Sequence, residues 1–161
     1  MSIDLIKKVN YMLISQKCQY ALRAIFELAK NKGKEPIKIA EIAKVQAIPS
    51  RFLEVILSQL KQAGFVDSVR GNEGGYLFLR SPESLTVGEI IRFVQGPIGP
   101  IDCIADKEKK SKCPLYGGCV FLSMWEKVGK AIEEVYDNTT IQDLLDQELQ
   151  QKEKYMPSYV I

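Results

Sequence analysis

The sequence contains no histidine, and this absence limits the chemistry that the chain can perform. Histidine is the side chain that enzymes use most often as a general acid or base near neutral pH. A phosphate-binding glycine loop before a helix is also missing, because the glycine-rich segment RGNEGG lies between two strand-like runs. We therefore predict that the chain is not an enzyme.

Long apolar runs are missing as well. No stretch approaches the roughly 18 apolar residues that span a membrane. The N-terminus MSIDLIKKVNYM lacks the apolar core and the cleavage site of a signal peptide. We therefore expect a soluble, cytoplasmic protein that does not bind membranes. Its 161 residues, 46% of them hydrophobic, suffice for one compact domain with an appendage.

What the chain does contain is four cysteines. Without an export signal, these favour metal binding or redox chemistry over disulfide bonds. Three of them, Cys103, Cys113 and Cys119, lie in the segment CIADKEKKSKCPLYGGC, whereas Cys18 is far away in sequence. The basic run KEKKSK is placed to lower the pKa of nearby thiols and to balance the charge of thiolates. The irregular spacing weakens the alternative of a structural zinc site.

Charge is distributed unevenly along the chain. Residues 1–80 carry 13 Lys and Arg against 7 Asp and Glu, whereas residues 81–161 carry 9 against 13. The N-terminal half therefore has the sign that a polyanion attracts, although an ordinary solvated surface can have the same balance.

Apolar periodicity predicts three helices in the basic half. The first covers residues 14–31 and stops before Gly33. The second is short and surrounds residues 39–43. The third has Pro49 in its first turn, Gly64 after its end, and an apolar stripe that we expect to be buried, formed by Phe52, Leu53, Ile56, Leu57 and Leu60. The last two helices, joined by a tight turn, form a helix-turn-helix candidate.

Two β-rich runs follow, at residues 65–69 and 76–79, and complete the element order of a winged helix. In that arrangement the second helix of the pair faces the DNA major groove and the hairpin tip reaches the backbone. Arg51 can donate to guanine and Glu54 can accept from cytosine. The candidate DNA-binding residues are Ser50, Arg51, Glu54, Ser58, Lys61, Arg70, Gly71, Gly74 and Gly75, the glycines allowing close approach of the backbone. A solvated helix face and an ordinary hairpin turn are the alternatives.

The second half begins with a capping box, Thr86 to Glu89, which starts a helix that ends before Gly96. No regular structure is predicted between Gly96 and Gly118. A helix from Cys119 then carries apolar residues at the 3.5-residue spacing of a coiled-coil seam, which predicts a homodimer interface formed by Phe121, Trp125, Val128, Ile132 and Val135. Burial of this stripe within its own domain is the alternative. Thr139 and Thr140 cap a last helix.

The predicted fold class is therefore mainly α with a small β-hairpin, a winged helix-turn-helix domain followed by a long dimerisation helix. We expect a DNA-binding domain at residues 1–96, of which 1–11 form an N-terminal extension. A cysteine-bearing sensor loop at 97–119 and the dimerisation and C-terminal helices at 120–149 follow. Residues 150–161 are expected to form a flexible tail.

These segments, in this order, resemble the Rrf-two (Rrf2) family of bacterial regulators. The resemblance rests on YALRAIFELA, SVRGNEGGYLFLR, TVGEIIRFVQGP, the three cysteines and a tryptophan-bearing helix followed by TTIQDLL, and covers residues 12–145. It implies a homodimeric winged-helix transcription factor, such as a repressor, that binds a double-stranded DNA operator. The loop cysteines of such regulators often hold an iron–sulfur cluster.

The resemblance also implies roles for particular residues. Cys103, Cys113 and Cys119 match three ligands of a 2Fe–2S or 4Fe–4S cluster, and Arg70 matches a wing arginine. Leu122 and Gln19 stand where relatives have a fourth ligand. We hypothesise that Cys18 supplies it. The alternatives are Asp102 or Asp106, a water or small molecule, or a merely buried Cys18.

The signal would be redox state, nitric oxide or iron–sulfur status. A cluster-free thiol sensor, a cysteine-metabolism regulator and a small electron-transfer protein remain alternatives, although the last leaves the winged helix unexplained.

Overall fold

The computed structural model describes residues 14–155. This part of the chain folds into helices with one two-stranded antiparallel hairpin. The elements, in chain order, are α1 (Gln16–Lys30), α2 (Ile39–Val45), α3 (Ser50–Gln62), β1 (Val66–Val69), β2 (Gly75–Phe78), α4 (Val87–Gln95), α5 (Asp102–Ala105), α6 (Lys107–Ser111), α7 (Leu122–Asp137) and α8 (Ile141–Tyr155). No helix within these residues combines the length and apolarity needed to cross a bilayer.

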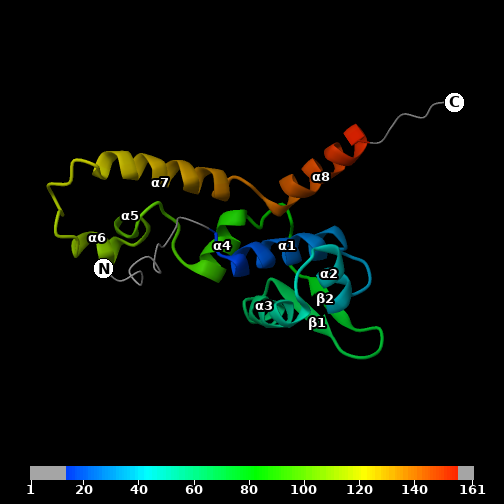
Figure 1. Ribbon diagram of the computed structural model, residues 1–161. Helices are drawn as coiled ribbons and strands as arrows, with labels where there is room; N and C mark the ends of the chain where they lie inside the picture. Colours follow the sequence, from blue (N-terminus) through cyan, green and yellow to red (C-terminus); the bar gives the residue numbers. More distant parts are fainter. Residues whose placement is uncertain (1–13, 156–161) are drawn as a thin grey trace, which may run out of the picture.

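Helices α1–α4 and the hairpin gather into one body, from which α7 and the segment carrying α5 and α6 extend to the left (Figure 1). Helix α3 and the hairpin lie on the side of this body away from α7. The hairpin pairs Val66 with Phe78 and Val69 with Gly75. The predicted mainly helical winged-helix class is therefore confirmed.

Helix α1 forms the centre of the core. Its apolar face is buried and packs against α3, α4, α8 and β2. Helix α3 buries Leu53, Ile56, Leu57 and Leu60, as its periodicity predicts, because these positions share one side of a 3.6-residue helix. Phe52 is the exception: its side chain is 49% exposed, so its assignment to the buried stripe was wrong. Position 52 lies at the edge of that stripe, one residue before the first core leucine.

The helix ends follow the predicted capping chemistry. Thr86 accepts a hydrogen bond from the backbone N–H of Glu89 at 3.2 Å, at the start of α4. Thr140 does the same for Asp143 at 3.1 Å, and the Asp143 carboxylate accepts the Thr140 N–H in return. Gly64 follows α3 with a left-handed φ of +74°, which a residue with a Cβ rarely adopts.

The cysteine segment contains helices that the sequence did not predict. Helices α5 and α6 occupy part of the stretch between Gly96 and Gly118 that was expected to be irregular. Local capping explains α6, because the Asp106 carboxylate accepts the Glu108 N–H at 2.9 Å. Neither helix buries a residue, so no apolar period marked them in the sequence.

The C-terminal boundary also differs from the expected one. Helix α8 continues to Tyr155, although a tail was expected from residue 150. Its later turns combine favourable helix formers with ion pairs such as Lys152 to Glu148, at 3.0 Å. The expected N-terminal extension, residues 1–11, and the last residues of the expected tail, 156–161, lie outside the described residues.

Helix α7 is fixed to α4 at its C-terminal end. Arg92 donates two hydrogen bonds to Asp137, at 2.6 and 2.8 Å. A Cβ at Gly88 would lie 2.0 Å from the nearer Asp137 oxygen, so a glycine leaves the room that this pair requires. The opposite end of α7 follows directly on the cysteine segment, and Ile104 of α5 lies against Gly129 of α7.

Candidate nucleic-acid interface and cysteine pocket

The exposed face of α3 carries the predicted DNA-reading residues. Ser50, Arg51, Glu54 and Ser58 are all exposed, on the side of the helix opposite its buried leucines. The structure therefore brings them together as one solvent-facing strip. Val55 is exposed among them, although sequence reasoning did not assign it. Its spacing of four residues from Arg51 is the signal that could have found it.

Arg51 is held by an aromatic ring. Its guanidinium carbon lies 4.9 Å from the ring centroid of Phe52, within the range of a cation–π contact. The exposed Phe52 ring therefore supports the Arg51 side chain and does not contribute to the core. It also restricts the positions that the Arg51 guanidinium can take at the start of α3.

Lys61 is tied to the base of the hairpin. Its ammonium lies 3.1 Å from an Asp67 carboxylate oxygen and hydrogen-bonds the Ser68 hydroxyl. The Ser68 backbone N–H, which donates to Asp67, and the Lys61 ammonium hold the pKa of Asp67 below its usual range. Lys61 is exposed on α3, as the predicted DNA-binding residues are, and it also pairs with β1, so its contact with DNA stays a prediction.

The hairpin tip presents Arg70 to solvent. Gly71, which follows it, has a φ of +108° that favours glycine. Gly74 and Gly75 have a different reason: a Cβ would lie 2.3 Å from the Val69 carbonyl oxygen at Gly74 and 2.4 Å from that of Ile37 at Gly75. Close backbone packing inside the protein therefore explains these two glycines, and their contact with DNA stays a prediction.

A polar clasp, formed by Glu27, Lys30, Gln46 and Glu148, anchors the turn between α2 and α3. Glu27 of α1 is only 8% exposed and accepts a 2.7 Å hydrogen bond from the Gln46 side chain, which lies at the turn. Lys30 lies 3.4 Å from Glu27 and 3.1 Å from Glu148 of α8. The clasp therefore links the helix-turn-helix to the C-terminal helix. Sequence periodicity missed it because Glu27 occupies a core-facing position of α1.

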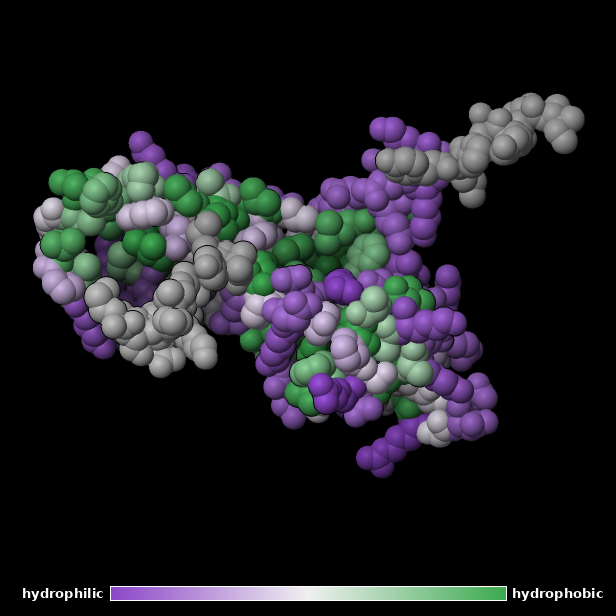
Figure 2. Space-filling view, viewed as in Figure 1, coloured by the Kyte–Doolittle hydropathy of each residue, from purple (hydrophilic) through white to green (hydrophobic). Residues whose placement is uncertain are grey.

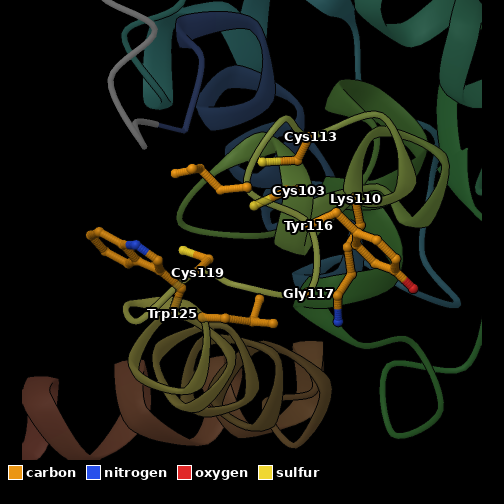
Figure 3. A pocket seen from close by; sticks show the side chains of 9 residues that line it. Cys103, Lys110, Cys113, Tyr116, Gly117, Cys119 and Trp125 are labelled. Atoms are coloured by element: carbon orange, nitrogen blue, oxygen red, sulfur yellow. The ribbon is translucent and has the colours of Figure 1, made fainter.

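The three loop cysteines line one small pocket between the cysteine segment and the start of α7. Figure 3 shows the sulfur atoms of Cys103, Cys113 and Cys119 pointing toward the same side, where the Trp125 ring lies beside Cys119. All four cysteines of the chain are free thiols. The remaining lining residues are Lys110, Leu115, Tyr116, Gly117 and Leu122. The structure therefore brings together the three residues that the sequence singled out.

Comparison with known proteins decides the family. The Rrf2 family model, described as an iron-dependent transcriptional regulator, matches residues 14–147. The chain belongs to the Rrf2 family of transcription regulators. This family bears the winged helix described above, and its regulators bind DNA.

Individual relatives agree with this assignment. The transcriptional regulator CymR of Bacillus subtilis (strain 168) is 35% identical over 145 residues, which are 90% of this chain and 98% of CymR. The solved structure of that protein, described as the global cysteine regulator, matches 84% of this chain and 97% of its own with a TM-score of 0.68. The structure of T. potens IscR, 34% identical, covers 91% of this chain and 93% of its own with a TM-score of 0.70.

The Rrf2 resemblance implied an iron–sulfur cluster, and the donors of the pocket fit such a cluster in kind. Thiolates are the ligands that iron–sulfur clusters prefer. Their arrangement does not fit: within residues 14–155 no three His, Cys, Asp or Glu side chains, the three pocket cysteines included, are grouped so that they could hold a metal ion. Asp102 is paired with Lys109 at 3.1 Å and Asp106 caps α6, so both carboxylate alternatives are already engaged.

Cys18 does not lie in the pocket. It is 0% exposed and packs with Val87, Ile91 and Ile98 between α1 and α4. Burial raises the pKa of the Cys18 thiol from its ordinary value of 9.0 to about 11. A thiol that is both enclosed and resistant to deprotonation is a poor ligand, so the structure gives Cys18 a packing role in this Rrf2 protein and does not support it as the fourth ligand.

The predicted dimer seam of α7 divides into two groups. Phe121 and Val135 are exposed, whereas Ile132 is partly buried against the cluster around Cys18. Trp125 and Val128 are of intermediate exposure. Figure 2 shows apolar side chains, in green, exposed over the start of α7 and the preceding segment. The exposed residues there are Leu115, Tyr116, Val120, Phe121 and Met124.

Proposed function

We propose that this chain acts as a homodimer that binds a DNA operator through α3 and the hairpin tip, and that its cysteine segment is the sensor. Arg51, Glu54 and Ser58 contact bases, and Arg70 contacts the backbone or the minor groove. The dimer forms along α7, where apolar residues such as Phe121 and Met124 are exposed. A two-fold dimer matches the symmetry of palindromic operators.

One observation carries the sensor proposal: the three free thiols of the cysteine segment line the same pocket at the start of α7. The other end of α7 is held to the DNA-binding body by Arg92 and Asp137. A change in the order of the segment between Pro97 and Cys119 therefore acts on the helix that spaces the two recognition helices. A hundred-fold change in operator affinity requires about 2.7 kcal/mol of differential stabilisation.

In the first sensor chemistry, Cys103, Cys113 and Cys119 would hold an iron–sulfur cluster. When bound, the cluster supplies reactivity toward oxidants or nitric oxide. The three thiolates would position it, and Lys110, which is paired with Glu126 at 2.7 Å, and Trp125 line the same pocket. The fourth ligand comes from outside the four cysteines, because Cys18 is enclosed in the core.

In the second sensor chemistry the thiols act without a metal. Two observations support this candidate: the described residues contain no group of three donors arranged to hold a metal ion, and the B. subtilis relative is described as a cysteine regulator. The three thiols would then be oxidised at the pocket by an external oxidant, to sulfenic acids or to a disulfide. Both chemistries use the same three cysteines, so mutation of these cysteines alone does not distinguish them. The iron and sulfide content of the purified protein does.

Anaerobic purification tests the sensor chemistry. Visible absorption together with iron and acid-labile sulfide in the wild-type protein supports the cluster, and their loss in Cys103→Ser, Cys113→Ser and Cys119→Ser assigns the ligands. A colourless, iron-free protein whose operator affinity changes on mild oxidation supports thiol sensing. Equal operator affinity under all conditions, at matched salt, would contradict both chemistries.

DNA binding is tested separately with an operator selected from random sequences. We expect Arg51→Ala to weaken operator binding by about 1–3 kcal/mol, because it removes a bidentate base contact. Lys130→Ala, an exposed cation on α7, is the control for a simple loss of positive charge. If both variants bind as tightly as the wild type, α3 is not the reading helix.

A further inference from the structure

One apolar side chain lies within the exposed polar strip of α3. Val55 is 57% exposed, and it follows Arg51 by four residues and precedes Ser58 by three. An α-helix turns once every 3.6 residues, so these three positions share one face. The buried residues of α3 face the opposite side, at Leu53, Ile56, Leu57 and Leu60. Val55 is therefore not an extension of the core stripe.

A valine at position 55 contributes little to the stability of the protein itself. A side chain that is more than half exposed adds little packing energy, and β-branched residues are weaker helix formers than Ala, Glu or Lys. Single exposed apolar residues are common on protein surfaces. This one differs by its place, because it lies between the arginine and the serine proposed to face the bases.

We propose that Val55 determines operator specificity by contacting the 5-methyl group of a thymine. The inference rests on the proposed function, in which α3 enters the major groove. There the thymine methyl is the one apolar group on a base edge, and apolar side chains recognise it. The N-terminal turns of a recognition helix make the base contacts, and Val55 lies in the second turn of α3.

The arrangement on α3 also predicts where that thymine lies. Arg51 precedes Val55 by about 6 Å of helix axis, since the rise is roughly 1.5 Å per residue. Base pairs are spaced by about 3.4 Å, so the two residues reach bases on the order of two steps apart. The stack of the Arg51 guanidinium on Phe52 limits its positions and keeps this spacing defined. Each half-site should therefore contain a thymine within about two base pairs of the guanine read by Arg51.

Replacement of thymine by deoxyuridine tests the proposal, because it removes only the methyl group. The operator is first selected from random-sequence DNA with the wild-type protein, and each thymine is then replaced in turn at fixed salt. For the wild type we expect one replacement per half-site to weaken binding about fourfold, the effect of roughly one buried methyl group. For Val55→Ala the same replacement should change affinity less than twofold.

Two further variants separate methyl recognition from other effects. Val55→Thr keeps one γ-methyl and should retain the sensitivity to deoxyuridine. Leu149→Ala removes an equally exposed apolar side chain, 58% accessible, on the distant helix α8, and should behave as the wild type. Circular dichroism of all three variants checks that the fold is retained.

The outcomes are distinct. Equal sensitivity of wild type and Val55→Ala at every thymine, or no sensitive thymine at all, overturns the assignment of Val55 and leaves the DNA-binding proposal intact. Failure of the wild-type protein to prefer any sequence overturns the proposed function and this inference together.

Discussion

The winged-helix body and the cysteine segment are held together in different ways. The body buries two apolar clusters that both involve α1, whereas α5 and α6 bury no residue and are kept in place by caps, surface ion pairs and the contact of Ile104 with Gly129 of α7. Apolar burial is the main source of stability in a folded domain, and exposed ion pairs contribute little. The winged-helix body should therefore keep its conformation, whereas a change in the conformation of the cysteine segment should cost little free energy.

Truncation of large side chains should show the largest difference between the two regions. Leu57→Ala in the core should lower the free energy of unfolding by about 3–5 kcal/mol, because it leaves a cavity. Leu115→Ala, in the exposed part of the cysteine segment, should change it by less than about 0.5 kcal/mol. Urea unfolding followed by circular dichroism measures both. Similar losses in the two variants would show that the segment belongs to the same cooperative core.

Replacement by serine should affect stability at one cysteine and the sensor response at another. Cys18→Ser places a hydroxyl among Val87, Ile91 and Ile98 and should destabilise the fold by about 1–3 kcal/mol. Cys113→Ser should leave stability nearly unchanged and abolish the sensor response. Urea midpoints and operator titrations provide the two readouts. Loss of iron in a Cys18→Ala protein that folds normally would restore Cys18 as a ligand.

The raised pKa of Cys18 predicts a dependence of stability on pH. The unfolded thiol ionises near its ordinary value of 9.0 and the folded thiol only near 11, so the unfolded state loses its proton first. The stabilisation is therefore complete below about pH 9 and is lost as the pH rises toward 11. Between pH 8 and pH 10 the free energy of unfolding of the wild type should therefore fall by about 1 kcal/mol more than that of Cys18→Val, which has no thiol to ionise. Urea unfolding at each pH measures both.

Removal of a helix cap should give the smallest effect and the finest comparison. Thr86→Ala should lower the free energy of unfolding by about 1 kcal/mol, because α4 is part of the core. Asp106→Ala should leave the urea midpoint unchanged and speed amide hydrogen exchange in α6 alone. A shift of the urea midpoint in Asp106→Ala would mean that α6 unfolds together with the body.

The two regions also differed in how well the sequence predicted them. In the body, apolar periodicity, glycine stops and capping boxes located α1, α3, the hairpin and α4. These patterns reflect the apolar burial and the capping hydrogen bonds that form the elements. In the cysteine segment, α5 and α6 were missed because they have no apolar face. The convergence of Cys103, Cys113 and Cys119 was expected from resemblance, and no local rule for helices or turns would have predicted it.

Other features were not predicted for a common physical reason: the pattern around a residue does not show which other groups contact it in the folded protein. Glu27 occupies a core-facing position and is satisfied by Gln46, which periodicity cannot show. Gly75 was assigned to the approach of DNA, and the sequence did not show that the Ile37 backbone leaves no room for a Cβ there. Phe52 looked like a core residue and instead supports Arg51.

Trp125 gives the protein an intrinsic optical reporter. It is the single tryptophan of the chain, and it lines the pocket of the three loop cysteines. Its emission therefore originates at one known position, without interference from a second indole in the winged-helix body. Fluorescence can therefore follow events at the sensor in unlabelled protein, and adding operator DNA to the same sample tests whether binding through α3 changes the surroundings of the sensor pocket.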